Sequence, residues 1–183
     1  IGAMLCTSEI YSAIENGSGF FQHGHTYLGH PMAAAAANAV LDVLLDENVL
    51  SEVTPKGKVL EGHLKSKFDQ NPHVGDIRGR GLFRAIELVE DRDTKVAFDS
   101  ELKLAASIKK SAQENGLLCY PMSGTVDGKL GDHILLAPPF TISEHELDEL
   151  VEKLSVTIDQ VIQKLVWHCS KKSFLKIALR NPI

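Results

Sequence analysis

The sequence has 183 residues, enough for one sizeable hydrophobic core, and 44% of them are hydrophobic while 23% are charged. This composition is typical of a globular protein and excludes a fibrous repeat or a disordered chain. The formal net charge of -5 gives no electrostatic attraction for a phosphate backbone, so we expect no nucleic-acid partner.

The first third of the sequence predicts a strand, two helices and a loop. Residues 1–7 predict a short buried strand, and a serine cap then opens a short helix that ends at Gly17. Residues 16–30 combine glycine, aromatic residues and histidine without a regular period, which indicates a loop of the kind that often carries function. Pro31 begins an alanine-rich run that predicts a long, largely buried helix, with a break at Thr54 and Pro55.

The rest of the sequence alternates between helical and strand patterns. A helix follows the break, and the glycine-rich VGDIRGRGLFRAIELVED predicts two strands joined by a tight turn. An amphipathic helix, the strands LLCYP and HILLAPPF, and a last helix with a Ser143–Glu146 capping box come next. The pattern predicts an α/β or α+β fold: the end of a larger sheet domain, a long connecting helix and a small αβ domain.

Two further features bear on the environment of the protein. The longest apolar stretch, residues 32–45, is shorter than the roughly 20 residues that span a bilayer, so we expect no membrane segment. Cys6, Cys119 and Cys169 lie far apart without a CxxC pair, which favours a reducing, cytoplasmic location. The opening residues show no signal-peptide pattern. Because the sequence starts at Ile1 rather than at a methionine, in what looks like the middle of an element, we expect a fragment of a longer protein.

The loop before Pro31 carries the residues that most suggest chemistry. His23, His25 and His30 are metal-ligand types, but no carboxylate or cysteine completes the set, so we predict no metal site. The alternative is that these histidines bond the backbone of a tight loop. A second interpretation is anion binding by Thr26 at the start of a helix, and ordinary helix entry is its alternative.

Three segments in order resemble the class III aminotransferases. HGHTYLGHPMAAAAANAVLDVL resembles the segment after the family's active-site lysine, and VGDIRGRGLFRAIELV resembles its glycine-rich strand pair. GDHILLAPPFTISEHELDEL resembles its closing strand, double proline and final helix. The opening IGAML also resembles the residues just after the family's lysine-bearing loop, so the resemblance covers the chain from Ile1 to about Leu165 in a consistent order.

The resemblance implies the C-terminal portion of a fold type I transferase that depends on pyridoxal 5'-phosphate. Residues 1–55 would be a remnant of the large cofactor-binding domain with the start of the connecting helix. Residues 56–165 would be the small αβ domain, and residues 166–183 a tail of unclear role. The family is usually a homodimer with shared active sites, so we expect a second copy as partner.

The resemblance also implies roles for individual residues. The threonine that matches Thr26 would hydrogen-bond the cofactor phosphate of the other subunit, helped by the backbone N–H of His25 or Thr26 itself. No lysine in this sequence has the context of the lysine that forms the Schiff base, so we expect that residue upstream of Ile1 and assign no catalytic residue here.

Substrate recognition is where the sequence departs from the family. Many members place a carboxylate-binding arginine before the closing strand, but between Tyr120 and Phe140 the only cationic residues are Lys129 and His133. Arg78 and Arg80 are the alternatives, and we assign the substrate-binding role to Arg78. Arginines flanked by glycine are, however, at least as often structural, bonding carbonyls across a strand pair.

We therefore expect a transaminase that moves an amino group from an amine or amino acid to a 2-oxo acid, as part of a longer protein. The 183-residue chain alone is expected to be inactive. The alternatives are a non-catalytic truncated relative that keeps only the small domain and the dimer surface, and a small metal-binding module.

Overall fold

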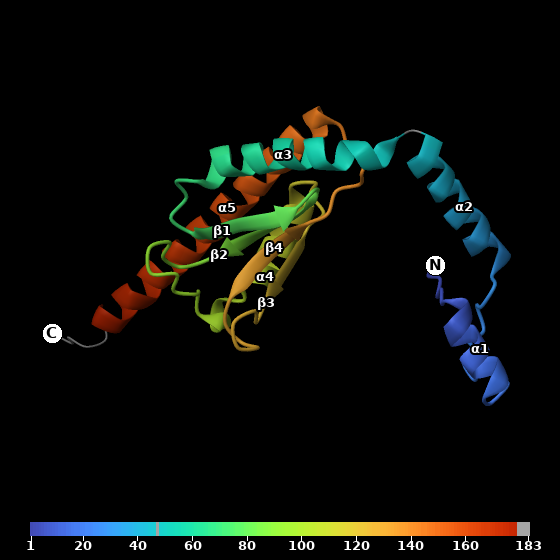
Figure 1. The fold of residues 1–183 in the computed structure, drawn as a ribbon. Helices are drawn as coiled ribbons and strands as arrows, with labels where there is room; N and C mark the ends of the chain where they lie inside the picture. The colour runs from blue at the N-terminus through green and yellow to red at the C-terminus, as the bar shows by residue number, and fades with distance from the viewer. Residues whose placement is uncertain (47, 179–183) are drawn as a thin grey trace. The chain divides into compact units, whose positions relative to one another are not determined.

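The computed structural model describes residues 1–46 and 48–178, apart from the side chains of residues 166–178. By its internal contacts the chain divides into two compact units, Ile1–Leu50 and Ser51–Ile183, whose elements are labelled in Figure 1. The units are defined by contacts alone, so the division into functional domains stays a prediction. Each unit is described by itself below.

The first unit contains two helices, α1 (Ser8–Asn16) and α2 (Pro31–Asp46), and both were expected. The cap of α1 is Thr7 rather than a serine, because the Thr7 hydroxyl accepts a hydrogen bond from the Ile10 amide at 3.4 Å. Residues 1–7 are exposed and form no strand, so the prediction of a buried strand is wrong. A strand needs a partner for its backbone groups, and no described segment pairs with this one.

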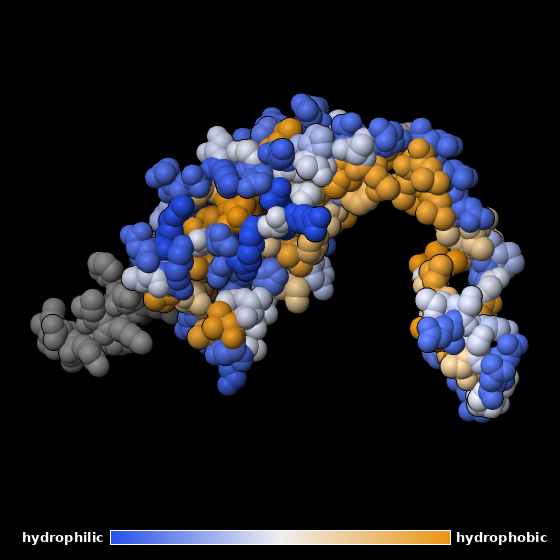
Figure 2. All heavy atoms as spheres, viewed as in Figure 1, coloured by the Kyte–Doolittle hydropathy of each residue, from blue (hydrophilic) through white to orange (hydrophobic). Residues whose placement is uncertain are grey.

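Helix α2 forms where its alanine-rich sequence predicts, but the prediction that it is largely buried is wrong. None of its residues is buried, and several large apolar side chains are exposed: Met32, Val40, Leu41, Val43 and Leu45. Figure 2 shows hydrophobic residues at the surface along this helix. The helix therefore has the predicted apolar face, but no described residue of this unit covers that face.

The break between the two long helices lies earlier than predicted. Asn48 has a φ of 53°, the left-handed conformation that asparagine tolerates after a helix end, and α3 (Val49–Phe68) starts at the next residue. Pro55 lies inside α3 rather than before it. Helix α3 then ends at Phe68.

The second unit is built on a four-stranded antiparallel sheet. Its strands are β1 (Val74–Arg80), β2 (Phe83–Leu88), β3 (Tyr120–Ser123) and β4 (Asp132–Leu136), in the order β1-β2-β4-β3. The predicted glycine-rich strand pair is confirmed. Gly81 has a φ of 55°, the left-handed conformation that this tight turn requires.

Helices α3, α4 (Leu104–Glu114) and α5 (Glu144–Ala178) all contribute to the core on one face of the sheet, and a short 3-10 helix, η1 (Ser100–Leu102), precedes α4. Figure 1 shows α3 and α5 lying along this sheet. Fully buried members of the core include Leu60, Leu64, Ile86, Leu88, Ile108, Ile134, Leu147, Leu154 and Ile158. The mixed helix and sheet architecture agrees with the predicted fold class.

Both ends of helix α5 can be compared with the predictions from the sequence. The capping box before it is confirmed, since the Ser143 amide donates to the Glu146 carboxylate at 2.8 Å and the Glu146 amide donates to the Ser143 hydroxyl at 3.3 Å. At its other end the helical backbone continues to Ala178, beyond the expected end near Leu165. The tail that we predict for residues 166–183 lies outside the part of the chain whose side chains the structure describes.

Candidate functional site

The turn before α2 is formed by two backbone hydrogen bonds. The Leu28 amide donates to the His25 carbonyl at 3.0 Å, and the His30 amide donates to the Tyr27 carbonyl at 3.2 Å. Gly29 has a φ of 70°, a conformation that side chains with a Cβ rarely adopt. The predicted loop thus ends in an ordered turn, with Thr26 near its start.

His30 caps the helix that follows. Its ring Nδ1 accepts a hydrogen bond from the Ala33 amide at 3.2 Å, and its carbonyl accepts one from Ala34 at 3.0 Å. This Nδ1 can accept only in the neutral ring with the proton on Nε2. For His30, the interpretation that a loop histidine bonds the backbone is confirmed.

Thr26 is exposed, and its environment fits an anionic group. Among the described residues its hydroxyl makes no hydrogen bond, and no backbone bond uses the amide of His25 or of Thr26. One hydroxyl and two amides therefore remain free to donate, close in sequence to the positive end of α2. This donor set suits a phosphate, which accepts strong charge-assisted hydrogen bonds.

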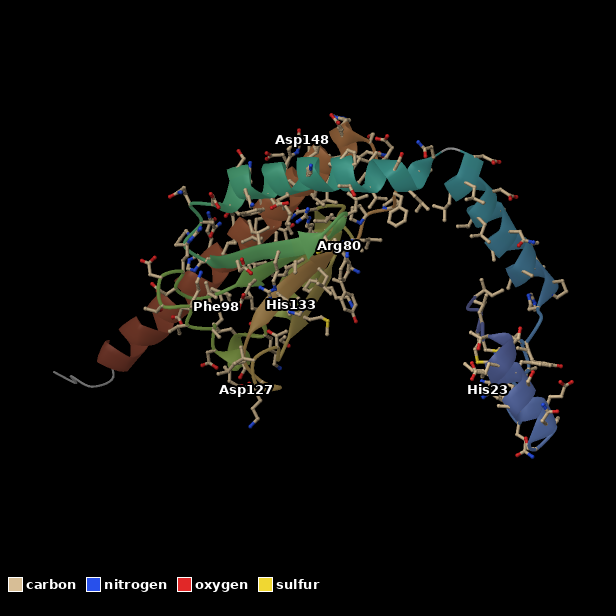
Figure 3. The ribbon with its side chains drawn as sticks, in the orientation of Figure 1. His23, Arg80, Phe98, Asp127, His133 and Asp148 are labelled. Carbon is tan, nitrogen blue, oxygen red and sulfur yellow. The ribbon has the colours of Figure 1, made fainter. Side chains whose placement is uncertain are left out.

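The loop histidines do not converge within the described part of the chain. There, no group of three histidine, cysteine, aspartate or glutamate side chains lies close enough to hold a metal ion. His23 instead places its ring 5.8 Å from that of Phe21, and Figure 3 labels it in the first unit.

Arg78 lies on β1 with its guanidinium already paired. Its Nη1 contacts Asp76 at 2.9 Å and Glu87 at 2.8 Å, and its side chain is about half exposed. Donating hydrogen bonds to the carboxylates of Asp76 and Glu87 raises the pKa of Arg78 above its usual value. A substrate carboxylate would have to compete with both of these partners.

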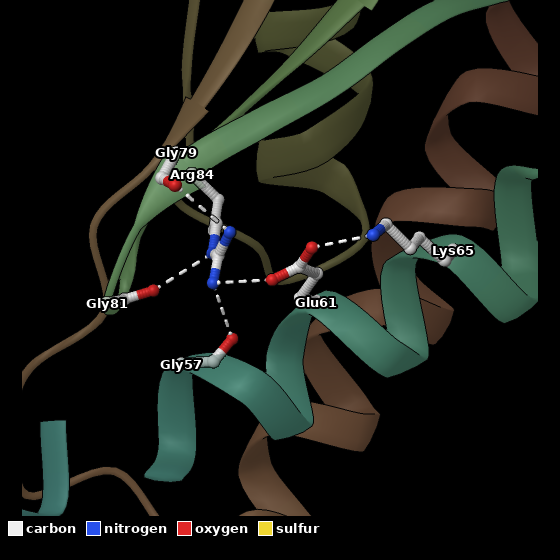
Figure 4. A network of polar contacts seen from close by, with 6 residues as sticks. All are labelled: Gly57, Glu61, Lys65, Gly79, Gly81 and Arg84. Carbon is white, nitrogen blue, oxygen red and sulfur yellow. Dashed lines mark hydrogen bonds and ion pairs between the residues drawn. The ribbon is translucent and has the colours of Figure 1, made fainter. Parts of the chain in front are cut away.

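The arginine that bonds the glycine carbonyls is Arg84, which sequence reasoning did not single out. As Figure 4 shows, this buried side chain donates to Gly81 at 2.9 Å, Gly79 at 3.2 Å and Gly57 at 2.9 Å. Its Nη2 also lies 3.0 Å from the Glu61 carboxylate. The network joins α3 to the turn between β1 and β2, so its role is structural.

A hydrogen bond from Lys65 and the charge of Arg84 lower the pKa of the Glu61 carboxyl at the edge of this network. The carboxylate therefore stays ionised opposite the two cations.

Lys129 lies in the loop between β3 and β4, and His133 lies on β4; these two residues stand where many family members have an arginine. The amide of Lys129 donates to the Asp127 carboxylate at 2.9 Å, which fixes the loop backbone. His133 lies on β4 with its Nδ1 enclosed and without a hydrogen-bond partner among the described residues. Figure 3 labels Asp127 in the loop and His133 on the sheet.

Cys119 is a partly buried core residue. It packs against the hydrophobic core, and burial raises the pKa of its thiol to about 11. At neutral pH the thiol stays protonated, so it is a poor nucleophile.

Comparison with known proteins decides the family. The family model "Aminotransferase class-III" matches residues 1–158. The chain belongs to the class III aminotransferases. This family depends on pyridoxal 5'-phosphate, so the predicted cofactor is that of the family.

Individual relatives agree with the family. An uncharacterized aminotransferase of Schizosaccharomyces pombe is 44% identical over 148 residues, which are 81% of this chain and 31% of that protein. The crystal structure of a transaminase from the marine bacterium Virgibacillus superposes with a TM-score of 0.77 at 32% identity, over 87% of this chain and 35% of the other.

A pyridoxal-phosphate-bound aminotransferase mutant from Vibrio fluvialis superposes with a TM-score of 0.73 at 31% identity, over 86% of this chain and 32% of the other. The present chain thus spans about a third of the length of the relatives it matches. No helix in the described part of this aminotransferase chain is long and apolar enough to cross a membrane.

Proposed function

We propose that this class III aminotransferase chain acts, within its whole protein, in the transfer of an amino group from an amine or amino acid to a 2-oxo acid. The family match over residues 1–158 supports the reaction class. The single observation that carries the role of this segment is the exposed turn at Thr26, with its unused hydroxyl and amides.

In this proposal Thr26 and the amides of His25 and Thr26 hold the cofactor phosphate. When bound, pyridoxal phosphate supplies the carbonyl that takes up the amino group and the ring that withdraws electrons. A hydroxyl and amides that bind the phosphate anchor the cofactor at one end and leave its ring free. The lysine that would attach to the cofactor is expected in a segment before Ile1.

We also propose that the turn serves the neighbouring subunit of a homodimer. Thr26 is exposed in its own unit, as contact with another chain requires, and the same unit has exposed apolar residues such as Tyr27 and Leu41. Sedimentation of the purified protein should give twice the monomer mass. A monomer that still binds the cofactor fully would contradict the shared site.

We propose that Arg78 binds the substrate carboxylate. To do so, its side chain must release its present partners, Asp76 and Glu87. Asp76 and Glu87 both occupy Nη1, and a bidentate carboxylate needs two parallel N–H donors. If this role is right, Arg78→Ala should raise the KM for amino acids and 2-oxo acids without affecting amines that lack a carboxylate. An equal change for both substrate types would contradict it.

A cytoplasmic location remains part of the proposal. It is supported by Cys6 and Cys119, which are free thiols in the structure. Fractionation of the source cells, followed by detection of the protein with an antibody, would test it, and recovery from an oxidising compartment would contradict it.

The phosphate contact can be tested with a matched pair of variants. Thr26→Ala removes the hydroxyl, while Thr26→Ser keeps it. Because hydrogen bonds to charged groups contribute about 1.5–3 kcal/mol, we expect Thr26→Ala to bind pyridoxal phosphate about tenfold or more weakly. The serine variant should stay close to the native protein.

The measurement is an absorbance titration of the protein produced from its full reading frame, together with an assay of amino transfer. Equal cofactor affinity in the native protein and Thr26→Ala would refute the phosphate contact. A protein that shows neither cofactor absorbance nor transfer would instead favour the alternative, a non-catalytic relative.

A further inference from the structure

We propose that His30 is the positioning residue of the Thr26 turn. On this view the capping ring of His30 sets the direction in which the Thr26 hydroxyl points. The inference rests on the proposed function, since it concerns the same phosphate-binding turn. It adds a residue that touches no cofactor atom and acts through the backbone.

The first support is the attachment of His30 to α2. Its ring Nδ1 accepts from the Ala33 amide at 3.2 Å, and its carbonyl accepts from the Ala34 amide at 3.0 Å. The carbonyl accepts the first i→i−4 bond of the helix, and the ring satisfies the Ala33 amide, which has no intrahelical partner. His30 is thereby fixed relative to the helix axis at two points.

The second support is the attachment of His30 to the turn itself. Its amide donates to the Tyr27 carbonyl at 3.2 Å, and its ring meets the Tyr27 ring edge-on with the centroids 6.2 Å apart. Tyr27 follows Thr26 directly in the chain. The orientation of Thr26 is therefore linked, through one peptide unit, to a residue that the helix holds.

The third support is that Thr26 makes no hydrogen bonds of its own to the described residues that would fix its direction. Within the described residues neither its hydroxyl nor its amide makes a hydrogen bond, and its side chain is exposed. Its direction is consequently determined by the turn on either side. Loss of the His30 contacts would let the turn move and would spread the free donors over many directions.

Two variants of His30 separate positioning from folding. His30→Ala removes the ring acceptor, and His30→Asn replaces it with an amide oxygen that also caps helices well. His23→Ala serves as a control in the same loop, because the ring of His23 contacts Phe21 and not the turn. Each protein is titrated with pyridoxal phosphate and with pyridoxal, which lacks the phosphate.

We expect His30→Ala to bind pyridoxal phosphate about three- to thirtyfold more weakly, the range that corresponds to the loss of a helix cap. Its affinity for pyridoxal should not change. His30→Asn should recover most of the affinity for the phosphorylated ligand, and His23→Ala should match the native protein with both ligands.

Other results would overturn the inference. Native affinity for pyridoxal phosphate in His30→Ala would do so directly. Equal weakening for both ligands, or failure of His30→Asn to recover binding, would mean that the ring does not act through the phosphate turn. Weak binding in Thr26→Ala with native binding in His30→Ala would remove only the role of His30, whereas native binding in Thr26→Ala would remove the proposed phosphate contact as well.

Discussion

Arg84 is the residue on which the turn between β1 and β2 depends. Its buried guanidinium donates to three carbonyls, those of Gly57, Gly79 and Gly81. Arg84→Ala would remove all three of these hydrogen bonds. We expect the free energy of unfolding to fall by roughly 2–4 kcal/mol, measured by urea denaturation.

Arg80 in the same hairpin is the matched control. Its side chain is exposed and forms no ion pair or hydrogen bond among the described residues, so Arg80→Ala should change stability by no more than about 0.5 kcal/mol. Similar losses in the two variants would show that the carbonyl network contributes little.

The contrast between Arg78 and Arg84 shows what residue patterns can predict. The sequence suggests that an arginine flanked by glycine bonds backbone carbonyls, but Arg78 bonds two carboxylates and the carbonyls are bonded by Arg84, which has no glycine neighbour. The strand register decides which one, because Arg78 is placed opposite Ala85 on the exposed face while Arg84 points toward α3. That choice needs the packed helix, which local sequence does not describe.

Helix α3 approaches the β1–β2 turn closely enough to exclude a side chain at one position. A Cβ on Gly57 would lie 2.5 Å from backbone atoms of Gly81, whereas a Cβ on Gly62 would meet nothing within 4 Å. We expect Gly57→Ala to destabilise the protein, by about 1–3 kcal/mol from overpacking. Gly62→Ala should stabilise it by about 0.5–1 kcal/mol, because alanine is the better helix former.

Thermal or urea unfolding of the two variants tests the contact, since they make the same chemical change in the same helix. Two changes of the same sign would mean that α3 shifts to accommodate the methyl group.

The hydrogen-bond acceptor at the N-terminus of helix α4 is a side chain from another element. Lys103 at its start offers no side-chain bond, while the Ala105 amide donates to Asp132 on β4. Burial raises the pKa of the Asp132 carboxyl, and the bond from Ala105 only partly opposes it. The charged form is therefore disfavoured in the folded protein.

A raised pKa in the folded state makes protonation favour folding, and this contribution is lost as pH rises through the folded pKa. We expect Asp132→Asn, which is uncharged and keeps an acceptor, to gain stability relative to the native protein as pH rises from about 4 toward 7. Urea denaturation over a pH series measures the difference. A difference that stays constant, or falls with pH, would contradict the assignment.

At the scale of the whole molecule the two units differ in how much they bury. In residues 1–46 and 48–50 the only buried side chain is Val49, whereas Ser51–Ile183 contains the hydrophobic core. A segment without a core opens easily and is cleaved readily. Limited proteolysis of the 183-residue chain should therefore cut first within residues 1–50.

Mass spectrometry should then find a resistant fragment that includes residues 56–165. First cuts within β1, β2 or β4 would contradict this order of stability.

The sequence by itself determined the features that depend on neighbouring residues. The capping box of Ser143 and Glu146, the glycine-rich hairpin, the helix after Pro31 and the resemblance to class III aminotransferases all follow from short contiguous patterns. Propensities, caps and turn residues act over a few positions, so the chain displays them directly.

The tertiary structure alone decided which groups meet across long separations and which faces are covered. It selected Arg84 for the glycine carbonyls, brought Asp132 to the start of α4 and left α2 exposed. It also moved the helix break to Asn48 and kept Pro55 inside α3. Burial and long-range bonding depend on pairs of distant elements, whereas sequence patterns report each element separately.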